Sequence, residues 1–135
     1  MGLAEEIAAV HAHEGDPQAL VGEFRRAVLL VPVAGGGLMT AVTGGVRWIY
    51  AFTGEESLAR FARARDAPPD EPWEYLELLG ARLTDAVIPD MDGPAGVAVD
   101  VADEGAAMLF PPARGIVPDD VAVDVGVAGE GRSGL

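Results

Sequence analysis

The sequence predicts an α+β fold, also describable as mixed α/β, in a single domain. We expect one mixed sheet of about five or six strands that contains an antiparallel hairpin and is flanked by helices. The chain of 135 residues has the usual length of one domain. Its hydrophobic residues, 50% of the total, fall partly into short unbroken runs typical of buried strands and partly into helical spacing. Both kinds of segment alternate along the chain, which favours a mixed architecture.

Residues 1–24 are predicted to form an N-terminal helical segment. Leu3, Ile7 and Val10 have the spacing of a short amphipathic helix that is expected to end near Glu14-Gly15. Asp16 then stands at an N-cap, with Pro17 at the first position of a second helix.

Residues 25–125 are predicted to form the α+β core. An unbroken apolar run at residues 27–33 has the length of a strand, and its continuity indicates a central strand covered on both faces. After a glycine turn, residues 38–43 and 46–52 are expected to pair as a hairpin across Gly44-Gly45.

Thr53-Gly54-Glu55-Glu56 has the pattern of a capping box. In such a box the threonine hydroxyl accepts from the amide of the second glutamate, whose carboxylate accepts from the threonine amide. The apolar spacing that follows predicts a helix over about residues 54–66.

Residues 73–78 are ambiguous, because their apolar positions fit a strand or the beginning of the next helix. We prefer a strand, since Gly80 interrupts the pattern. A helix over about residues 81–87 should follow and stop before Pro89.

Two more strands and a helical turn complete the predicted core. Residues 96–101 alternate valine with other residues, which places Asp100 on the outer face. A further strand is expected at residues 106–110 and a last helical turn at residues 118–120. Residues 126–135 are glycine-rich and polar, so we expect a disordered tail.

The composition excludes several classes of site. The chain carries no cysteine and no lysine, so it has no disulfide, no cysteine nucleophile or zinc ligand, and no Schiff-base lysine. Its 22 acidic residues against nine arginines give a net charge of -13, which argues against nucleic acid and anionic membranes as partners. We find no run long and apolar enough to span a membrane. Because the first residues are acidic where a signal peptide needs cations, we expect a cytoplasmic protein.

No motif predicts a catalytic residue, a metal ion or another cofactor. His11 and His13 are two apart, whereas metal ligands on a helix lie three or four apart. Asp90-Met91-Asp92-Gly93 resembles the start of a calcium loop, but Val101 stands where such a loop needs glutamate. The glycine runs lack the dinucleotide-binding spacing.

Four residues are candidate interaction residues. Arg60 and Arg63 lie three apart on the predicted 54–66 helix and could grip an acidic partner, although pairing within the chain is the favoured interpretation. Trp73 and Tyr75 follow a proline-rich loop. Aromatic side chains at such a place either anchor a protein interface or pack in the core, and both interpretations stay open. We expect Trp48 to belong to the core.

Over about residues 20–125 the chain resembles the N-terminal domain of the SseB family. The segments that carry the resemblance are Val31-Pro32-Val33, Phe52-Thr53 with Glu55-Glu56 and Leu58, Gly80-Ala81-Arg82-Leu83, Gly96-Val97-Ala98-Val99-Asp100, and Phe110-Pro111-Pro112. The chain departs from the family where members often carry Asn-Pro-Gly, since Asp100-Val101-Ala102-Asp103 stands there. The resemblance implies a compact bacterial α/β domain of poorly defined function, and it supplies no catalytic residue.

We therefore predict a non-enzymatic protein that binds another protein or itself. The alternative is a small-ligand sensor with a pocket between the sheet and the 54–66 helix. A third possibility is an enzyme with paired carboxylates, for example Asp90 and Asp92, although nothing in the sequence separates their pKa values.

Overall fold

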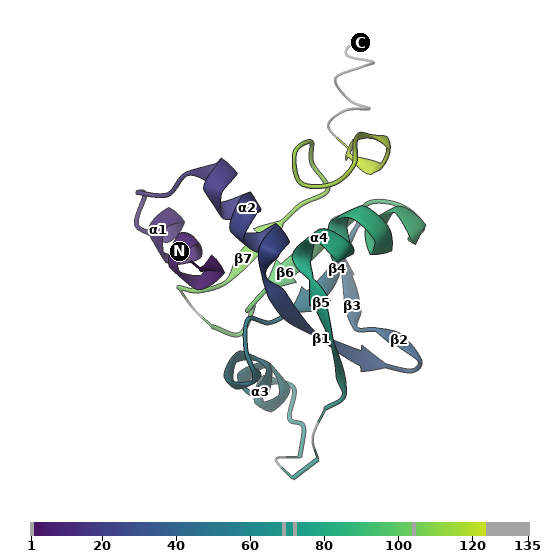
Figure 1. Ribbon diagram of the computed structural model, residues 1–135. Helices are drawn as coiled ribbons and strands as arrows, with labels where there is room; N and C mark the ends of the chain where they lie inside the picture. The colour runs from purple at the N-terminus through teal and green to yellow at the C-terminus, as the bar shows by residue number, and fades with distance from the viewer. Residues whose placement is uncertain (1, 69, 72, 104, 124–135) are drawn as a thin grey trace.

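The computed structural model describes residues 2–68, 70–71, 73–103 and 105–123, and it confirms the predicted α+β fold of one domain (Figure 1). The helices are α1 (Leu3–His11), α2 (Pro17–Arg26), α3 (Glu55–Ala64) and α4 (Gly80–Arg82), with the π-helical turn η1 (Leu83–Val87) and the 3-10 turns η2 (Ile88–Asp90) and η3 (Asp119–Val121). The strands are β1 (Val28–Ala34), β2 (Gly37–Leu38), β3 (Thr40–Thr43), β4 (Val46–Ala51), β5 (Tyr75–Leu79), β6 (Ala95–Val99) and β7 (Met108–Phe110). The predicted tail at residues 126–135 lies outside the described residues.

The described strands form two sheets instead of one. The first is antiparallel, in the order β2-β1-β5, and the second has the order β3-β4-β6-β7, in which β4 and β6 are parallel. The sheets meet where the backbones of Leu30 and Phe52 exchange two hydrogen bonds of 2.8 Å. The sequence predicted one continuous sheet because strand lengths and spacing do not specify which strands pair.

The apolar run of β1 occupies the centre of its sheet, as predicted. Leu29 and Val31 are fully buried, with β2 on one side of the strand and β5 on the other. The predicted hairpin is also confirmed, because β3 and β4 pair across Gly44 and Gly45. Both glycines have positive φ (62° and 80°), a backbone region that other residues rarely adopt.

The buried face of β4 is the small, aliphatic one. Ile49 and Ala51 are fully buried, whereas Trp48 is only half-buried, so the expectation of a core Trp48 is corrected. Its ring covers Gly96 on the neighbouring strand, where a Cβ would lie 2.8 Å from the indole. The indole therefore packs on the backbone of β6 without reaching the main core.

Two hydrophobic clusters hold the fold together. The larger joins α1 and α2 to the second sheet, and in it the rings of Phe24 and Phe110 stack 4.2 Å apart. Gly80 lets α4 approach α2 closely, because a Cβ there would collide with the carbonyl oxygen of Phe24. The smaller cluster lies under α3 and contains Leu30, Phe52, Leu58 and Phe61.

Three local predictions need correction. α3 begins after Gly54 with no side-chain cap, so the Thr53–Glu56 capping box does not form. The helical stretch after β5 passes Pro89, which lies in the first turn of η2, where its missing amide costs no hydrogen bond. Asp100 is 3% exposed and not on the outer face. No helix within the described residues is long and apolar enough to cross a bilayer.

Candidate functional site

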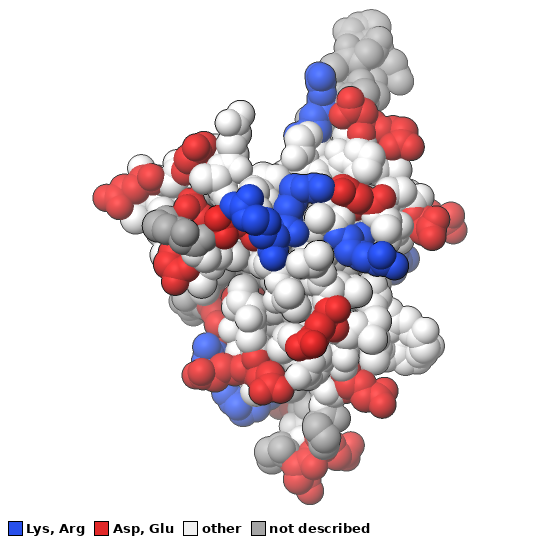
Figure 2. Space-filling view, viewed as in Figure 1, with Lys and Arg blue, Asp and Glu red and all other residues white. Residues whose placement is uncertain are grey.

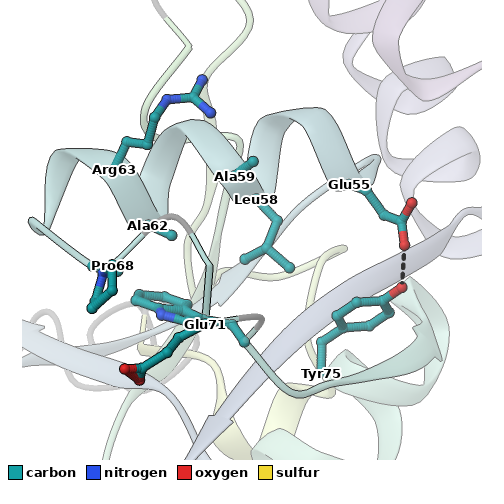
Figure 3. A pocket seen from close by; sticks show the side chains of 10 residues that line it. Glu55, Leu58, Ala59, Ala62, Arg63, Pro68, Glu71 and Tyr75 are labelled. Carbon is teal, nitrogen blue, oxygen red and sulfur yellow. Dashed lines mark hydrogen bonds between the residues drawn. The ribbon is translucent and has the colours of Figure 1, made fainter.

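A groove runs between α3 and the chain that leads from α3 to β5 (Figure 3). We call it the α3 groove; it has a volume of about 260 Å³. Its apolar lining comes from Leu58, Ala59 and Ala62 of α3 and from Pro68 and Trp73 on the other side. The small alanine side chains leave this stretch of α3 uncovered, and so they create the groove.

The polar side chains of the α3 groove lie toward its ends. Figure 3 shows Glu55 and Tyr75 joined at one end and Glu71 beside Pro68 at the other, with Arg63 on the outer side of the helix. The Tyr75 hydroxyl donates to the Glu55 carboxylate over 2.7 Å. This hydrogen bond raises the pKa of Tyr75 above its ordinary value, because the acceptor is an anion.

Aromatic packing fixes the wall opposite α3. Trp73 meets the ring of Phe61 edge to face, with centroids 5.8 Å apart. Phe61 in turn contacts Tyr50 and Phe52, and the Arg65 guanidinium lies 4.8 Å from the Phe61 centroid. Trp73 and Tyr75 are therefore half-buried, with one side in the smaller hydrophobic cluster and the other on the groove.

The structure brings three of the four candidate interaction residues together and separates the fourth. Trp73, Tyr75 and Arg63 all line the α3 groove. Arg60 instead binds Asp103 through Nε at 2.6 Å and Glu56 through Nη1 at 3.4 Å. Pairing within the chain, the interpretation favoured for the two arginines, is thus confirmed for Arg60.

A second polar cluster, which sequence reasoning missed, lies at the carboxyl ends of the parallel strands β4 and β6. Asp100 follows β6 and accepts two hydrogen bonds from Thr53, which follows Phe52 just after β4. The Thr53 amide lies 2.9 Å from Oδ1 and the Thr53 hydroxyl 2.7 Å from Oδ2. Burial raises the pKa of Asp100 above its ordinary value, although the bonds from Thr53 oppose the shift.

Asp103 extends this cluster to α3. Its carboxylate accepts from the Ser57 hydroxyl at 2.8 Å and from Arg60, and its side chain is 11% exposed. Burial acts to raise the pKa of Asp103, but the hydrogen bonds from Arg60 and Ser57 outweigh it, so the pKa lies below its ordinary value. We call Thr53, Ser57, Arg60, Asp100 and Asp103 the aspartate cluster.

The aspartate cluster ties the turn after β6 to the beginning of α3. Each carboxylate oxygen of Asp100 and Asp103 accepts a hydrogen bond from the chain itself, so the side chains already have partners. The sequence contains a signal for the aspartate cluster, because Thr53 and Asp100 each follow an apolar strand. The carboxyl ends of parallel strands meet at one edge of a sheet, so parallel pairing of these strands brings the two residues together. The parallel pairing needed to use that signal is not a local feature.

Other carboxylates considered from the sequence stay apart from these sites. Asp90 and Asp92 are both exposed. Among the described residues, no group of three or more histidine, aspartate or glutamate side chains is placed to hold a metal ion. The α3 groove is the surface on which three of the four predicted interaction residues converge.

Comparison of the chain with protein-family models, with curated proteins and with solved structures finds no match in any of the three.

Proposed function

We propose that this protein is a non-enzymatic protein-binding domain and that the α3 groove receives a segment of its partner. One observation supports this most directly: Trp73 and Tyr75 are each partly exposed on an open apolar groove. Partly exposed aromatic side chains in a pocket are the usual anchors of protein interfaces, because they bury a large area at little conformational cost. The resemblance to the SseB N-terminal domain leaves the function open and stays a prediction, as does a cytoplasmic location.

The test is affinity capture from a native lysate, with the wild-type protein and matched variants as baits. Trp73→Ala removes the aromatic anchor, and Ala62→Glu fills the groove with a charged side chain on a helix that accepts glutamate well. Leu109→Ala is the control, because Leu109 is 54% exposed on β7 and does not line the groove. Circular dichroism and thermal unfolding check that each bait is folded.

We expect a stoichiometric partner with the wild type and Leu109→Ala, and its loss with Trp73→Ala and Ala62→Glu. Light scattering after gel filtration shows whether this partner is a second copy. A strictly monomeric protein that retains no stoichiometric partner contradicts the proposal. Retention of the partner by both groove variants contradicts the assignment of the groove.

The second candidate is a sensor that binds a small molecule in the same groove, which is lined by α3 and by the segment that leads to β5. A volume of about 260 Å³ is slightly below the typical range for small-ligand pockets, about 300–1,000 Å³, so we rank it second. A thermal-shift screen of small metabolites tests it. A compound that stabilises the wild type and not Trp73→Ala favours the sensor.

A further inference from the structure

Among the residues that the structure describes, no strand pairs with one of the two backbone edges of β5. Strand β5 stands last in the order β2-β1-β5, and within the described chain it pairs with β1 alone. The Gly80 amide donates to Ala27 and the Val33 amide to Glu74, both at 3.0 Å. Because inward and outward groups alternate in an antiparallel pair, these bonds direct the amides and carbonyls of Tyr75, Glu77 and Leu79 away from β1.

This edge is the longest open one in the described sheets. The other outer strands, β2, β3 and β7, have two, four and three residues, whereas β5 has five. Edge strands are normally protected by proline, by a bulge or by charged side chains. β5 has neither a proline nor a bulge in its unbroken register, and Glu77 is its one charged side chain.

Exposed apolar side chains accompany the open backbone. Leu76 and Leu79 of β5 are 48% and 47% exposed, and Val28, opposite Leu79 on β1, is 55% exposed. In Figure 2 the surface over β5 is mostly uncharged, with acidic side chains and no basic ones in its lower part. Such a surface suits a partner strand that has apolar side chains and a few charged ones.

The charge pattern selects the kind of partner. Glu77 lies at the centre of β5 and Glu74 precedes the strand, both exposed, and the chain carries a net charge of -13. Antiparallel pairing of two β5 strands about their centre would place Glu77 opposite its own copy, and like charges directly opposite destabilise a sheet. A strand with lysine or arginine at alternate positions instead gains attraction at the same place.

We propose that the β5 edge binds an extended, cationic segment of a partner protein, which adds to the sheet as a fourth strand beside β5. The main-chain groups of Tyr75, Glu77 and Leu79 supply the hydrogen bonds, and Glu77 favours basic residues. This inference rests on the proposed protein-binding function and names its partner. The α3 groove and the β5 edge meet at Tyr75, whose side chain lines the groove and whose backbone lies on the edge.

The test is a titration of the full chain with a short blocked peptide of alternating valine and lysine, followed by amide NMR and hydrogen exchange. We expect the amides of Tyr75, Glu77 and Leu79 to shift and to exchange more slowly when the peptide is bound. A valine–glutamate peptide should bind at least about 10-fold more weakly, since it places like charges opposite Glu77.

Two variants at Leu79 separate the backbone contribution from the side chain. Leu79 has φ -65° and ψ 144°, so proline fits its backbone, and Leu79→Pro removes one outward amide without touching the bonds to β1. Leu79→Ala removes the side chain and keeps the amide. We expect Leu79→Pro to bind the valine–lysine peptide about 5-fold more weakly than Leu79→Ala, the effect of one hydrogen bond. Glu77→Lys should reverse the preference between the two peptides.

Three outcomes overturn this inference. The first is that hydrogen exchange of the Tyr75, Glu77 and Leu79 amides does not change at millimolar peptide, and the second is that Leu79→Pro and Leu79→Ala bind the valine–lysine peptide equally well. The third is that these amides already exchange slowly in the free protein, which shows that the edge already has a partner. The proposed function fails separately, through the capture experiment with groove variants. A captured partner that is lost with Trp73→Ala but kept by Leu79→Pro retains the groove and refutes the strand addition.

Discussion

The aspartate cluster makes a quantitative prediction about Asp100. Its side chain is 3% exposed, accepts two hydrogen bonds from Thr53, and belongs to a residue with φ of 50°. Aspartate and asparagine tolerate this left-handed conformation better than other residues that carry a Cβ. Replacement of Asp100 by Ala, Gly or Asn therefore separates the hydrogen bonds from the backbone strain.

The expected magnitudes follow from these contacts. Loss of two hydrogen bonds to a carboxylate, partly compensated by hydration of the exposed Thr53, destabilises Asp100→Gly by about 1–2 kcal/mol. The left-handed conformation adds about 1 kcal/mol for Asp100→Ala, which gives about 2–3 kcal/mol in total. Asp100→Asn keeps an acceptor for the Thr53 amide and tolerates the conformation, so we expect a loss below about 1 kcal/mol.

Urea unfolding followed by tryptophan fluorescence measures these differences, because Trp48 and Trp73 are both half-buried. Thermal unfolding should show a decrease in Tm of about 5–10 °C for Asp100→Ala. The reasoning is refuted if Asp100→Ala and Asp100→Asn unfold at the same urea concentration with the same slope. Equal stability of the Ala and Gly variants would refute the strain contribution alone.

Three further predictions concern pH, packing and an ion pair. Burial raises the pKa of Asp100 in the folded state. The contribution of Asp100 to the free energy of unfolding is therefore full at pH values below the ordinary pKa of 3.8, and it is lost as pH rises through the raised pKa. Urea unfolding of the wild type and of Asp100→Asn over this pH range measures the contribution. The pH dependence due to Asp85 has the opposite sign, because the bond to Arg25 lowers the pKa of Asp85. The contribution of Asp85 to stability is therefore full at pH values above the ordinary pKa of 3.8 and is lost as pH falls through the lowered pKa. Since this pair is nearly half-exposed, Asp85→Asn should cost less than about 1 kcal/mol in urea unfolding, and a larger loss would contradict the assignment. Gly80→Ala should lower the free energy of unfolding by about 1–3 kcal/mol, because the new Cβ meets the rigid backbone of α2. Gly22→Ala is the control: Gly22 lies within α2 with room for a Cβ, so the substitution should leave the free energy of unfolding unchanged or raise it by about 1 kcal/mol. Similar effects of both substitutions on the urea midpoint would show that the close approach at Gly80 is unimportant.

Charge placement illustrates a limit of sequence reasoning. The sequence placed Arg60 and Arg63 on one face of a helix, but Arg60 turns to Asp103, and the nearby Arg65 lies over the ring of Phe61. Figure 2 shows arginine side chains gathered over α2 and α4, a grouping of residues far apart in the sequence. Side chains on one helix share a face by periodicity, but their partners come from other segments.

The candidate site was predicted only in part for the same reason. Trp73 and Tyr75 were singled out because aromatic residues beside an exposed proline-rich loop are candidates for the surface, and both line the α3 groove. The groove itself depends on how α3 packs against the first sheet, which no spacing reveals. Thr53 had a convincing local partner in Glu56, yet it binds Asp100, because Gly54 and not Thr53 is the N-cap of α3.

The sequence by itself determined the features that depend on neighbours along the chain. The Asp16 cap of α2, the Gly44-Gly45 hairpin and the apolar run of β1 follow from side-chain size, backbone freedom and periodicity. Only the tertiary structure decided the division into two sheets, the burial of Asp100 and the open edge of β5. These features depend on which distant strands share hydrogen bonds, and strand pairing energy comes from contacts that a linear pattern does not specify.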